Sequence, residues 1–158
     1  MGRSRGRANQ SLYRARILLA AWEAQRESKA YPENRMLEAF LPAVKLHLGQ
    51  AYGWFLLSVS GVEESALNRP PGKVADLPAP AMGQMHAPEL AEFSQLEIDG
   101  WLADMLNDTE LGNPAAQLAS GDGLLVSDRQ SPGCAVAAGW ASSLGEIMAR
   151  MDDSLAEC

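Results

Sequence analysis

Apolar residues recur every three or four positions from Met36 to Val59, which is the strongest pattern in the chain. This spacing puts them on one face of an α-helix, as is typical of a helix packed on a core. We predict that the helix runs from Glu33 to Ser60, that Gly61 ends it, and that Pro42 kinks it, because proline removes one backbone hydrogen bond. The stripe consists of Met36, Phe40, Val44, Leu48, Ala51, Tyr52, Phe55, Leu56 and Val59.

Two glycines stand one turn apart within this predicted helix, at Gly49 and Gly53. Each destabilises a helix by about 1 kcal/mol relative to alanine. We therefore expect another helix to cross closely at this face.

A weaker form of the same spacing predicts a helix before this one. Asn9 or Ser11 can cap its first turn, and Pro32 disfavours helical geometry at the residue before it, so the helix should end by Ala30. Its apolar face consists of Leu12, Ala15, Leu19 and Trp22, widened by Ile17, Leu18 and Ala21.

Two more helices are predicted after a long connection. Between Asn68 and Pro88 the chain holds five of its nine prolines, so no regular element is expected there. A third helix should run from Pro88 to about Asn107, and a last one should begin at Ser131. The third has an apolar face of Leu90, Phe93, Ile98, Trp101, Leu102, Met105 and Leu106, and the last has one of Val136, Trp140, Leu144, Ile147, Met148, Met151 and Leu155.

These patterns predict an all-α fold, a four-helix bundle with a kinked second helix and a long proline-rich connection between the second and third helices. Residues 1–8 combine glycine, serine and arginine without apolar periodicity, which favours a flexible arginine-rich arm. Residues 9–158 then form a single helical-bundle domain, because a chain of this size can bury one sufficient core.

The composition of the chain indicates the cellular compartment and the kinds of partner to expect. Hydrophobic residues make up 47% and charged residues 21% of the chain, which is typical of a globular protein. The net charge of −7 disfavours nonspecific binding of nucleic acid by the body of the fold. Cys134 and Cys158 show no metal or redox spacing, so we interpret both as free thiols in a reducing compartment. We expect a cytoplasmic protein with no secretory signal and no transmembrane segment.

The two histidines, His47 and His86, offer little catalytic chemistry. No Glu or His lies three or four residues from His47, so we interpret it as a hydrogen-bonded structural residue. An enzymatic alternative would need His47 in a pocket beside Glu38 or Glu97. The sequence contains no phosphate loop, dinucleotide glycine motif, nucleophile elbow or paired Glu-x-x-His signature. We therefore predict no catalytic residue, no cofactor and no metal site.

Arginine is concentrated at the start of the chain. The first sixteen residues carry a formal charge of +5 and the remainder −12, within the total of −7. Such a segment can neutralise phosphates of nucleic acid or of lipid headgroups, with an affinity that falls as salt rises. The alternative is a solubilising tail that pairs with the acidic body. The candidate polyanion-binding residues are Arg3, Arg5, Arg7, Arg14 and Arg16.

Trp54 lies off the apolar stripe of its predicted helix, whereas the other tryptophans are expected in the core. Tryptophan is enriched at protein interfaces, since it joins a large apolar ring to a polar N–H. We therefore predict Trp54 to be an interface residue.

Short motifs are spread along the predicted helices: Asn9, Gln10, Leu12, Tyr13 and Ala15, then Trp22, Leu46 to Leu48, Ala51 with Tyr52, and Trp101 with Leu102. This set resembles an uncharacterised family of small all-helical bacterial proteins, described as a domain of unknown function. The similarity covers Asn9 to Leu106 and extends loosely over the last third. It implies a compact all-helical protein, and it carries no activity.

Two functional hypotheses follow. We expect a non-catalytic helical interaction or scaffold protein, bound to a protein partner or to further copies of itself. The alternative is a nucleic-acid-associated accessory protein that uses the arginine-rich start of the chain.

Overall fold

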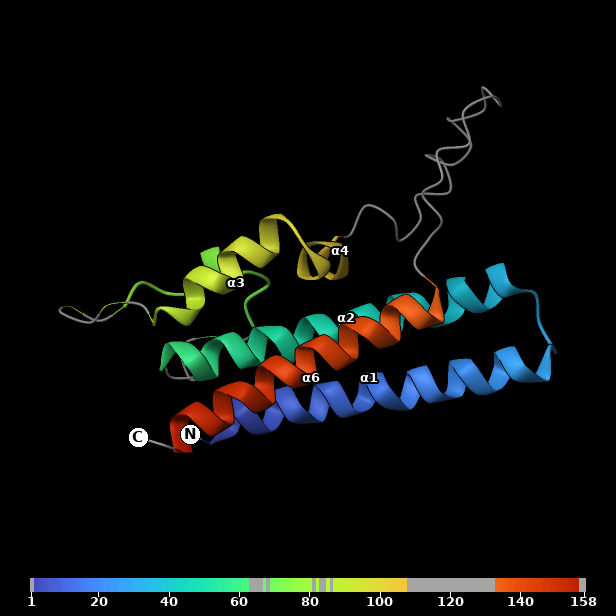
Figure 1. Cartoon of the computed structure of the whole chain (residues 1–158), viewed down its shortest axis with the longest axis horizontal. Coiled ribbons are helices and arrows are strands. Elements are labelled where there is room, and N and C mark those ends of the chain that lie inside the picture. The colour runs from blue at the N-terminus through green and yellow to red at the C-terminus, as the bar shows by residue number, and fades with distance from the viewer. Residues whose placement is uncertain are drawn as a thin grey trace, which may run out of the picture.

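The computed structural model describes residues 2–62, 67, 69–80, 82, 85, 87–107 and 133–156. In these residues every regular element is helical and no strand occurs, so the predicted all-α class is confirmed. The long helices α1, α2 and α6 lie side by side, and α3 and α4 lie against α2 (Figure 1). Because α2 contacts each of the other α-helices, it is the central element of the fold.

The helices α1 (Arg3–Ser28) and α2 (Glu33–Ser60) form an antiparallel hairpin (Figure 1). The rings of Trp22 and Phe40 stack near the turn, with centroids 5.8 Å apart. The bounds of α2 agree with the prediction, and Gly61 ends the helix in the left-handed conformation. Pro42 lies within α2 without ending it.

The last helix, α6 (Cys134–Ala156), runs antiparallel to α1 and brings the two ends of the chain together (Figure 1). The Cys134 thiol lies 4.0 Å from the carbonyl oxygen of Leu19 near one end of the pair. At the other end, Arg5 forms an ion pair of 2.5 Å with Asp152. These contacts hold α6 against α1 between Arg5 and Leu19.

The predicted arginine-rich arm is wrong, because α1 already begins at Arg3. Ala8 is fully buried, and the side chain of Arg5 is only 11% exposed. The segment has no apolar periodicity of its own, but its small and long side chains pack on α6 and α2. Packing against distant residues therefore extends this helix beyond the limit that the local pattern indicates.

The predicted third helix is divided into α3 (Glu89–Ile98) and α4 (Trp101–Leu106). Between them Gly100 adopts a φ of 143°, which residues with a side chain rarely adopt. The division also changes which residues are buried: Ile98, expected in the core, is 76% exposed. Before α3, a 3-10 turn, η2 (Val74–Asp76), packs against that helix.

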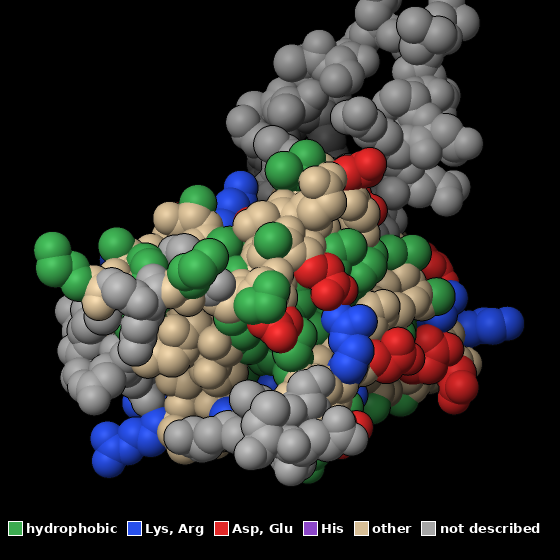
Figure 2. Space-filling model, turned by 60° about the vertical axis from the view of Figure 1, so that its left-hand side comes forward, with side chains coloured by type: hydrophobic (Ala, Val, Ile, Leu, Met, Phe, Trp, Pro, Cys, Tyr) green, Lys and Arg blue, Asp and Glu red, His purple; other side chains and the backbone are tan. Residues whose placement is uncertain are grey.

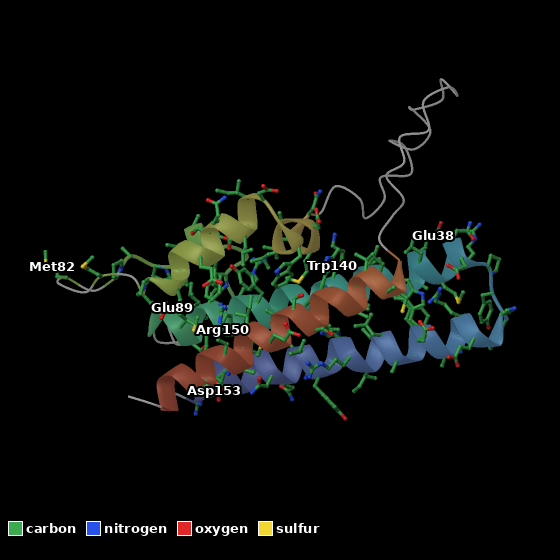
Figure 3. The ribbon with its side chains drawn as sticks, viewed as in Figure 1. Glu38, Met82, Glu89, Trp140, Arg150 and Asp153 are labelled. Carbon is green, nitrogen blue, oxygen red and sulfur yellow. The ribbon has the colours of Figure 1, made fainter. Side chains whose placement is uncertain are left out.

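The core largely follows the predicted stripes, with two further corrections. Ile17 on α1 is 52% exposed and Val136 on α6 is 49% exposed. At the start of α6 the fully buried residue is Ala137, next to the predicted Val136, whereas the predicted Trp140, Leu144, Met148 and Met151 are buried. Trp140 lies in the space between α6, α2 and α4 (Figure 3).

The predicted helix crossing at Gly49 and Gly53 is also wrong, although one of the two glycines does mark a close approach. A Cβ on Gly53 would lie 2.3 Å from the carbonyl oxygen of Pro71 and 2.8 Å from Cβ of Pro70. Nothing lies within 4 Å of a Cβ built on Gly49. The element that comes close to α2 is thus the extended proline segment and not a helix.

The predictions for His86 and Cys158 lie outside the described residues, whereas the last helix begins at Cys134, three residues after the predicted Ser131. Within the described part of the chain, no helix is both long enough and apolar enough to cross a membrane.

Candidate anion-binding pocket

The five arginines predicted to bind polyanions are distributed among different surroundings. Arg5 turns inward: its guanidinium donates to the carbonyl oxygen of Met148 and to Asp152, each at 2.5 Å, and lies 5.4 Å from the Phe55 ring centre. Arg16 lies against α6, where a Cβ on Gly145 would be 2.6 Å from its Nη2 atom. Arg5 therefore has a structural role and does not face a ligand, which corrects the prediction for this residue.

The remaining predicted arginines, Arg3, Arg7 and Arg14, are exposed on α1. Arg7 and Arg14 stand two turns apart on one face of the helix, and both line the same pocket, whereas Arg3 does not. A third arginine, Arg69, reaches this pocket from the proline-rich connection. The chain thus brings together three arginines from two segments that are far apart in the sequence.

The pocket has a volume of about 350 Å³ and lies between α1, α2 and the proline-rich connection. Among the described residues that line it, none is acidic. Guanidinium, amide and hydroxyl groups are all donors to an anionic oxygen, and arginine in particular matches the geometry of carboxylates and phosphates. Its lining consists of Arg7, Gln10, Ser11, Arg14, Gln50, Trp54, Arg69 and Pro70.

Trp54 forms a wall of this pocket and is only 9% exposed. The guanidinium carbon of Arg7 lies 4.6 Å from the centre of its ring, within the range of a cation–π interaction. Arg7 of the same chain covers its ring, and the interpretation of Trp54 as an interface residue stays a prediction. This contact also orients Arg7 toward the pocket.

Sequence reasoning missed Arg69 and Gln50 as members of this site. Arg69 comes directly before Pro70 and Pro71, and this segment approaches α2 so closely that only glycine fits at position 53. The combination of a glycine within a strong helix and an Arg-Pro-Pro sequence is the signal that could have suggested the contact.

His47 is half-buried on α2, and its Nδ1 atom has no hydrogen-bond partner among the described residues. The expectation of a hydrogen bond is thus not met at this atom. The carboxylates considered as its catalytic partners have other contacts: Glu38 pairs with Arg35 at 3.0 Å, and Glu97 accepts from Tyr52 at 2.7 Å. Neither carboxylate therefore bonds to the Nδ1 atom of His47.

The Tyr52–Glu97 pair links α2 to α3 inside the fold. Burial raises the pKa of the Tyr52 hydroxyl well above its usual value, and the hydrogen bond to Glu97 raises it further. The same carboxylate oxygen accepts from the backbone N–H of Val74 at 2.8 Å, so Glu97 also holds η2 in place. This is a structural network.

A second, wider cleft of about 560 Å³ lies between α2, the proline-rich connection and α4. Lys45 at its edge is only 7% exposed. Its ammonium group donates to the carbonyl oxygen of Asn107 and lies 5.7 Å from the Trp140 ring centre. The buried charge is thus stabilised by contacts within the chain.

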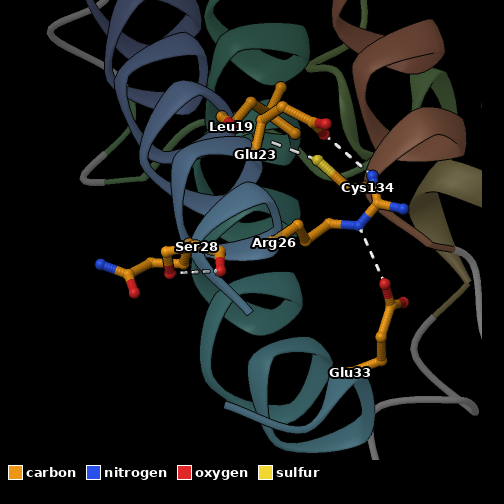
Figure 4. Close-up of polar contacts among 7 residues, drawn as sticks. Leu19, Glu23, Arg26, Ser28, Glu33 and Cys134 are labelled. Atoms are coloured by element: carbon orange, nitrogen blue, oxygen red, sulfur yellow. Dashed lines mark hydrogen bonds and ion pairs between the residues drawn. The ribbon is translucent and has the colours of Figure 1, made fainter. Parts of the chain in front are cut away.

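Arg26 joins the start and end of the α1–α2 turn and lies beside Cys134 (Figure 4). It donates to Glu23 at 2.9 Å and to Glu33 at 3.2 Å, and these two hydrogen bonds raise its pKa. Cys134 is a buried free thiol, as predicted, and burial followed by the hydrogen bond with Glu23 raises its pKa. A raised thiol pKa lowers nucleophilic reactivity at neutral pH.

The described residues contain no group of three or more His, Cys, Asp or Glu that could hold a metal ion. On the face shown in Figure 2, several acidic side chains lie next to one another at the right, with basic side chains on either side of them. Comparisons of the chain with protein-family models, curated proteins and solved structures find no match. The resemblance to a family of small bacterial helical proteins therefore stays a prediction.

Proposed function

We propose that this chain is a non-catalytic interaction protein that binds an anionic group of its partner in the arginine pocket. The observation that carries the proposal is the convergence of Arg7, Arg14 and Arg69 on one pocket whose described lining includes no acid. Charge-assisted hydrogen bonds from several guanidinium groups select a carboxylate cluster or a phosphate group. The fold supplies rigid positions for two of the three arginines, because both lie on α1.

A protein partner with acidic or phosphorylated residues fits this pocket better than nucleic acid does. Binding of single strands relies on aromatic rings on which bases stack. The ring of Trp54 is covered by Arg7 and almost fully buried. In addition, the net charge of −7 repels an extended polyanion outside the pocket. The test must therefore distinguish binding of a protein partner from binding of nucleic acid.

The proposal is tested by calorimetric titration of the protein with tripolyphosphate at low salt. We expect Arg14→Ala and Arg69→Ala each to raise Kd at least about tenfold, since a hydrogen bond to a charged group contributes about 1.5–3 kcal/mol. The matched control is Arg3→Ala, which removes the same charge from the same helix outside the pocket. We expect its Kd to change less than about twofold, as for an exposed charge.

If all three substitutions raised Kd equally, the attraction would be diffuse, and this result would contradict a pocket. The absence of any binding would contradict it as well. A second titration uses a single-stranded RNA oligonucleotide and an acidic phosphopeptide at two salt concentrations. Tighter binding of the RNA, with a steep salt dependence that Arg69→Ala reduces, would favour the nucleic-acid alternative over a protein partner.

A further inference from the structure

The outer face of α1 carries an apolar stripe that no described element covers. Tyr13 and Ile17 are 64% and 52% exposed, and Ala20 and Ala24 are also exposed. These residues are spaced by four, three and four positions, so they follow one another along a single line on the helix. Buried residues such as Leu12 and Leu19 occupy the opposite side of α1.

The stripe has the pattern of a short coiled-coil seam. Its spacing alternates between three and four residues, which is the heptad alternation of the two seam positions. The alanines at two of its positions allow a second helix to approach closely, because small side chains reduce the distance between helix axes. Gln10 and Glu27 continue the seam at its two ends, and both are exposed.

The charges beside the seam differ between its two halves. Arg16 and Glu23 lie on the same side of the seam, seven residues apart, in equivalent heptad positions. Both are exposed, but each also has a contact within its own chain: the Arg16 guanidinium lies against Gly145 of α6, and Glu23 reaches Arg26 at 2.9 Å. On the other side, the equivalent positions are Arg14 and Ala21, so no acidic residue stands there.

We propose that α1 pairs with α1 of a second copy of this chain in an antiparallel, two-fold symmetric arrangement. In this register Ile17 faces Ala20 of the partner subunit, and Tyr13 faces Ala24 of the partner subunit. Gln10 then faces Glu27 of the partner subunit, which places an amide donor against a carboxylate. Two-fold symmetry repeats each of these layers once.

Charge complementarity selects the antiparallel direction and the second copy. In this register Arg16 meets Glu23 of the partner subunit, and the symmetric pair forms at the same time. Arg14 meets Ala21 of the partner subunit on the other side, so no like charges face each other. A parallel pair would place Glu27 against Glu27 of the partner subunit and would leave Arg16 opposite an alanine. Only the antiparallel pair therefore satisfies both the apolar layers and the charges.

The proposed contact between the two α1 helices is small, so we expect it to be weak. A seam on one helix of each copy buries less than about 1,200 Å², which is the size of weak, transient interfaces. We therefore expect a reversible monomer–dimer equilibrium that is visible at high protein concentration. No residue of the apolar layers lines the arginine pocket, but Gln10 at the end of the seam and Arg14 beside it do. The variants that test the contact therefore leave both of these residues unchanged.

The test is sedimentation equilibrium of the full chain over a wide range of concentrations, from about 10 µM to about 1 mM. We expect dimerisation, and we expect Ile17→Glu to raise the dimer Kd at least about tenfold, because it buries a carboxylate in the central layer. The matched control is Ile98→Glu, which changes an even more exposed isoleucine on α3. We expect the control to dimerise like the unchanged chain.

Exchanging the charges of Arg16 and Glu23 tests whether the two α1 helices are antiparallel. Arg16→Glu or Glu23→Arg alone should raise Kd severalfold, because each places like charges opposite each other twice in the dimer. The double variant should restore the original Kd, and circular dichroism verifies that each variant is folded. A monomer at every concentration, a dimer insensitive to Ile17→Glu, or a failure of the double variant to restore binding would each overturn the proposal.

Discussion

At the scale of single residues, Gly53 is the position where the identity of one side chain decides a tertiary contact. A Cβ at this position would meet the carbonyl oxygen of Pro71 at 2.3 Å. We expect Gly53→Ala to lower the free energy of unfolding by about 1–3 kcal/mol, as overpacking does, although alanine is the better helix former. Gly49→Ala, with nothing within 4 Å, should raise it by up to about 1 kcal/mol. Urea unfolding of both variants measures the difference, and a stabilised Gly53→Ala would contradict the close approach.

Tyr52 makes the stability of the fold sensitive to alkaline pH. Its pKa is raised by burial and by the hydrogen bond to Glu97, so the folded chain keeps the proton that the unfolded chain loses near pH 10. The free energy of unfolding should therefore be independent of this group below pH 10 and fall by about 1.4 kcal/mol per pH unit above it. Chemical unfolding of the original chain and Tyr52→Phe from pH 8 to 11 tests this, and an unchanged slope in the variant would contradict it.

At the scale of elements, Gly100 determines that the third apolar segment forms two helices and not one. Its φ of 143° is accessible to glycine and strained for alanine. We expect Gly100→Ala to lower the free energy of unfolding by about 1–3 kcal/mol, without any gain in helical circular dichroism. The control is Gly139→Ala on α6, where nothing lies within 4 Å and alanine should stabilise. A more helical and more stable Gly100→Ala would mean that a continuous helix is accessible.

At the scale of the whole molecule, the first turns of α1 hold the two ends of the chain together. Arg5 reaches Met148 and Asp152 on α6, and Ala8 is fully buried. Deletion of residues 2–8 should therefore lower the free energy of unfolding by at least about 2 kcal/mol, through lost packing and lost charge-assisted hydrogen bonds.

The arginine at position 5 should account for much of this effect. We expect Arg5→Ala to lower the free energy of unfolding by about 1–3 kcal/mol, since its hydrogen bonds are to a carboxylate and a partly buried backbone carbonyl. Arg3→Ala, an exposed neighbour, should change it by less than about 0.5 kcal/mol. Thermal and urea unfolding measure all three variants, and a deletion without effect would restore the interpretation of residues 2–8 as a mobile arm.

The candidate site could be predicted only in part. The concentration of arginine in the first sixteen residues indicated an anion-binding role, and Arg7 and Arg14 do share a pocket. The pattern could not show that Arg5 turns inward or that Arg69 completes the site. A charged residue in a helix can face solvent or a neighbouring helix, and the choice depends on residues far away along the chain.

The sequence by itself determined the helical class and the limits of α2, because Pro32, Gly61 and the apolar spacing act over a few residues. Tertiary structure decided where α1 begins, because a turn without an apolar stripe becomes helical only when α6 and α2 bury Arg5 and Ala8. It also decided which arginines face one pocket. Local preferences extend over a turn or two, whereas these outcomes depend on contacts between residues more than forty positions apart.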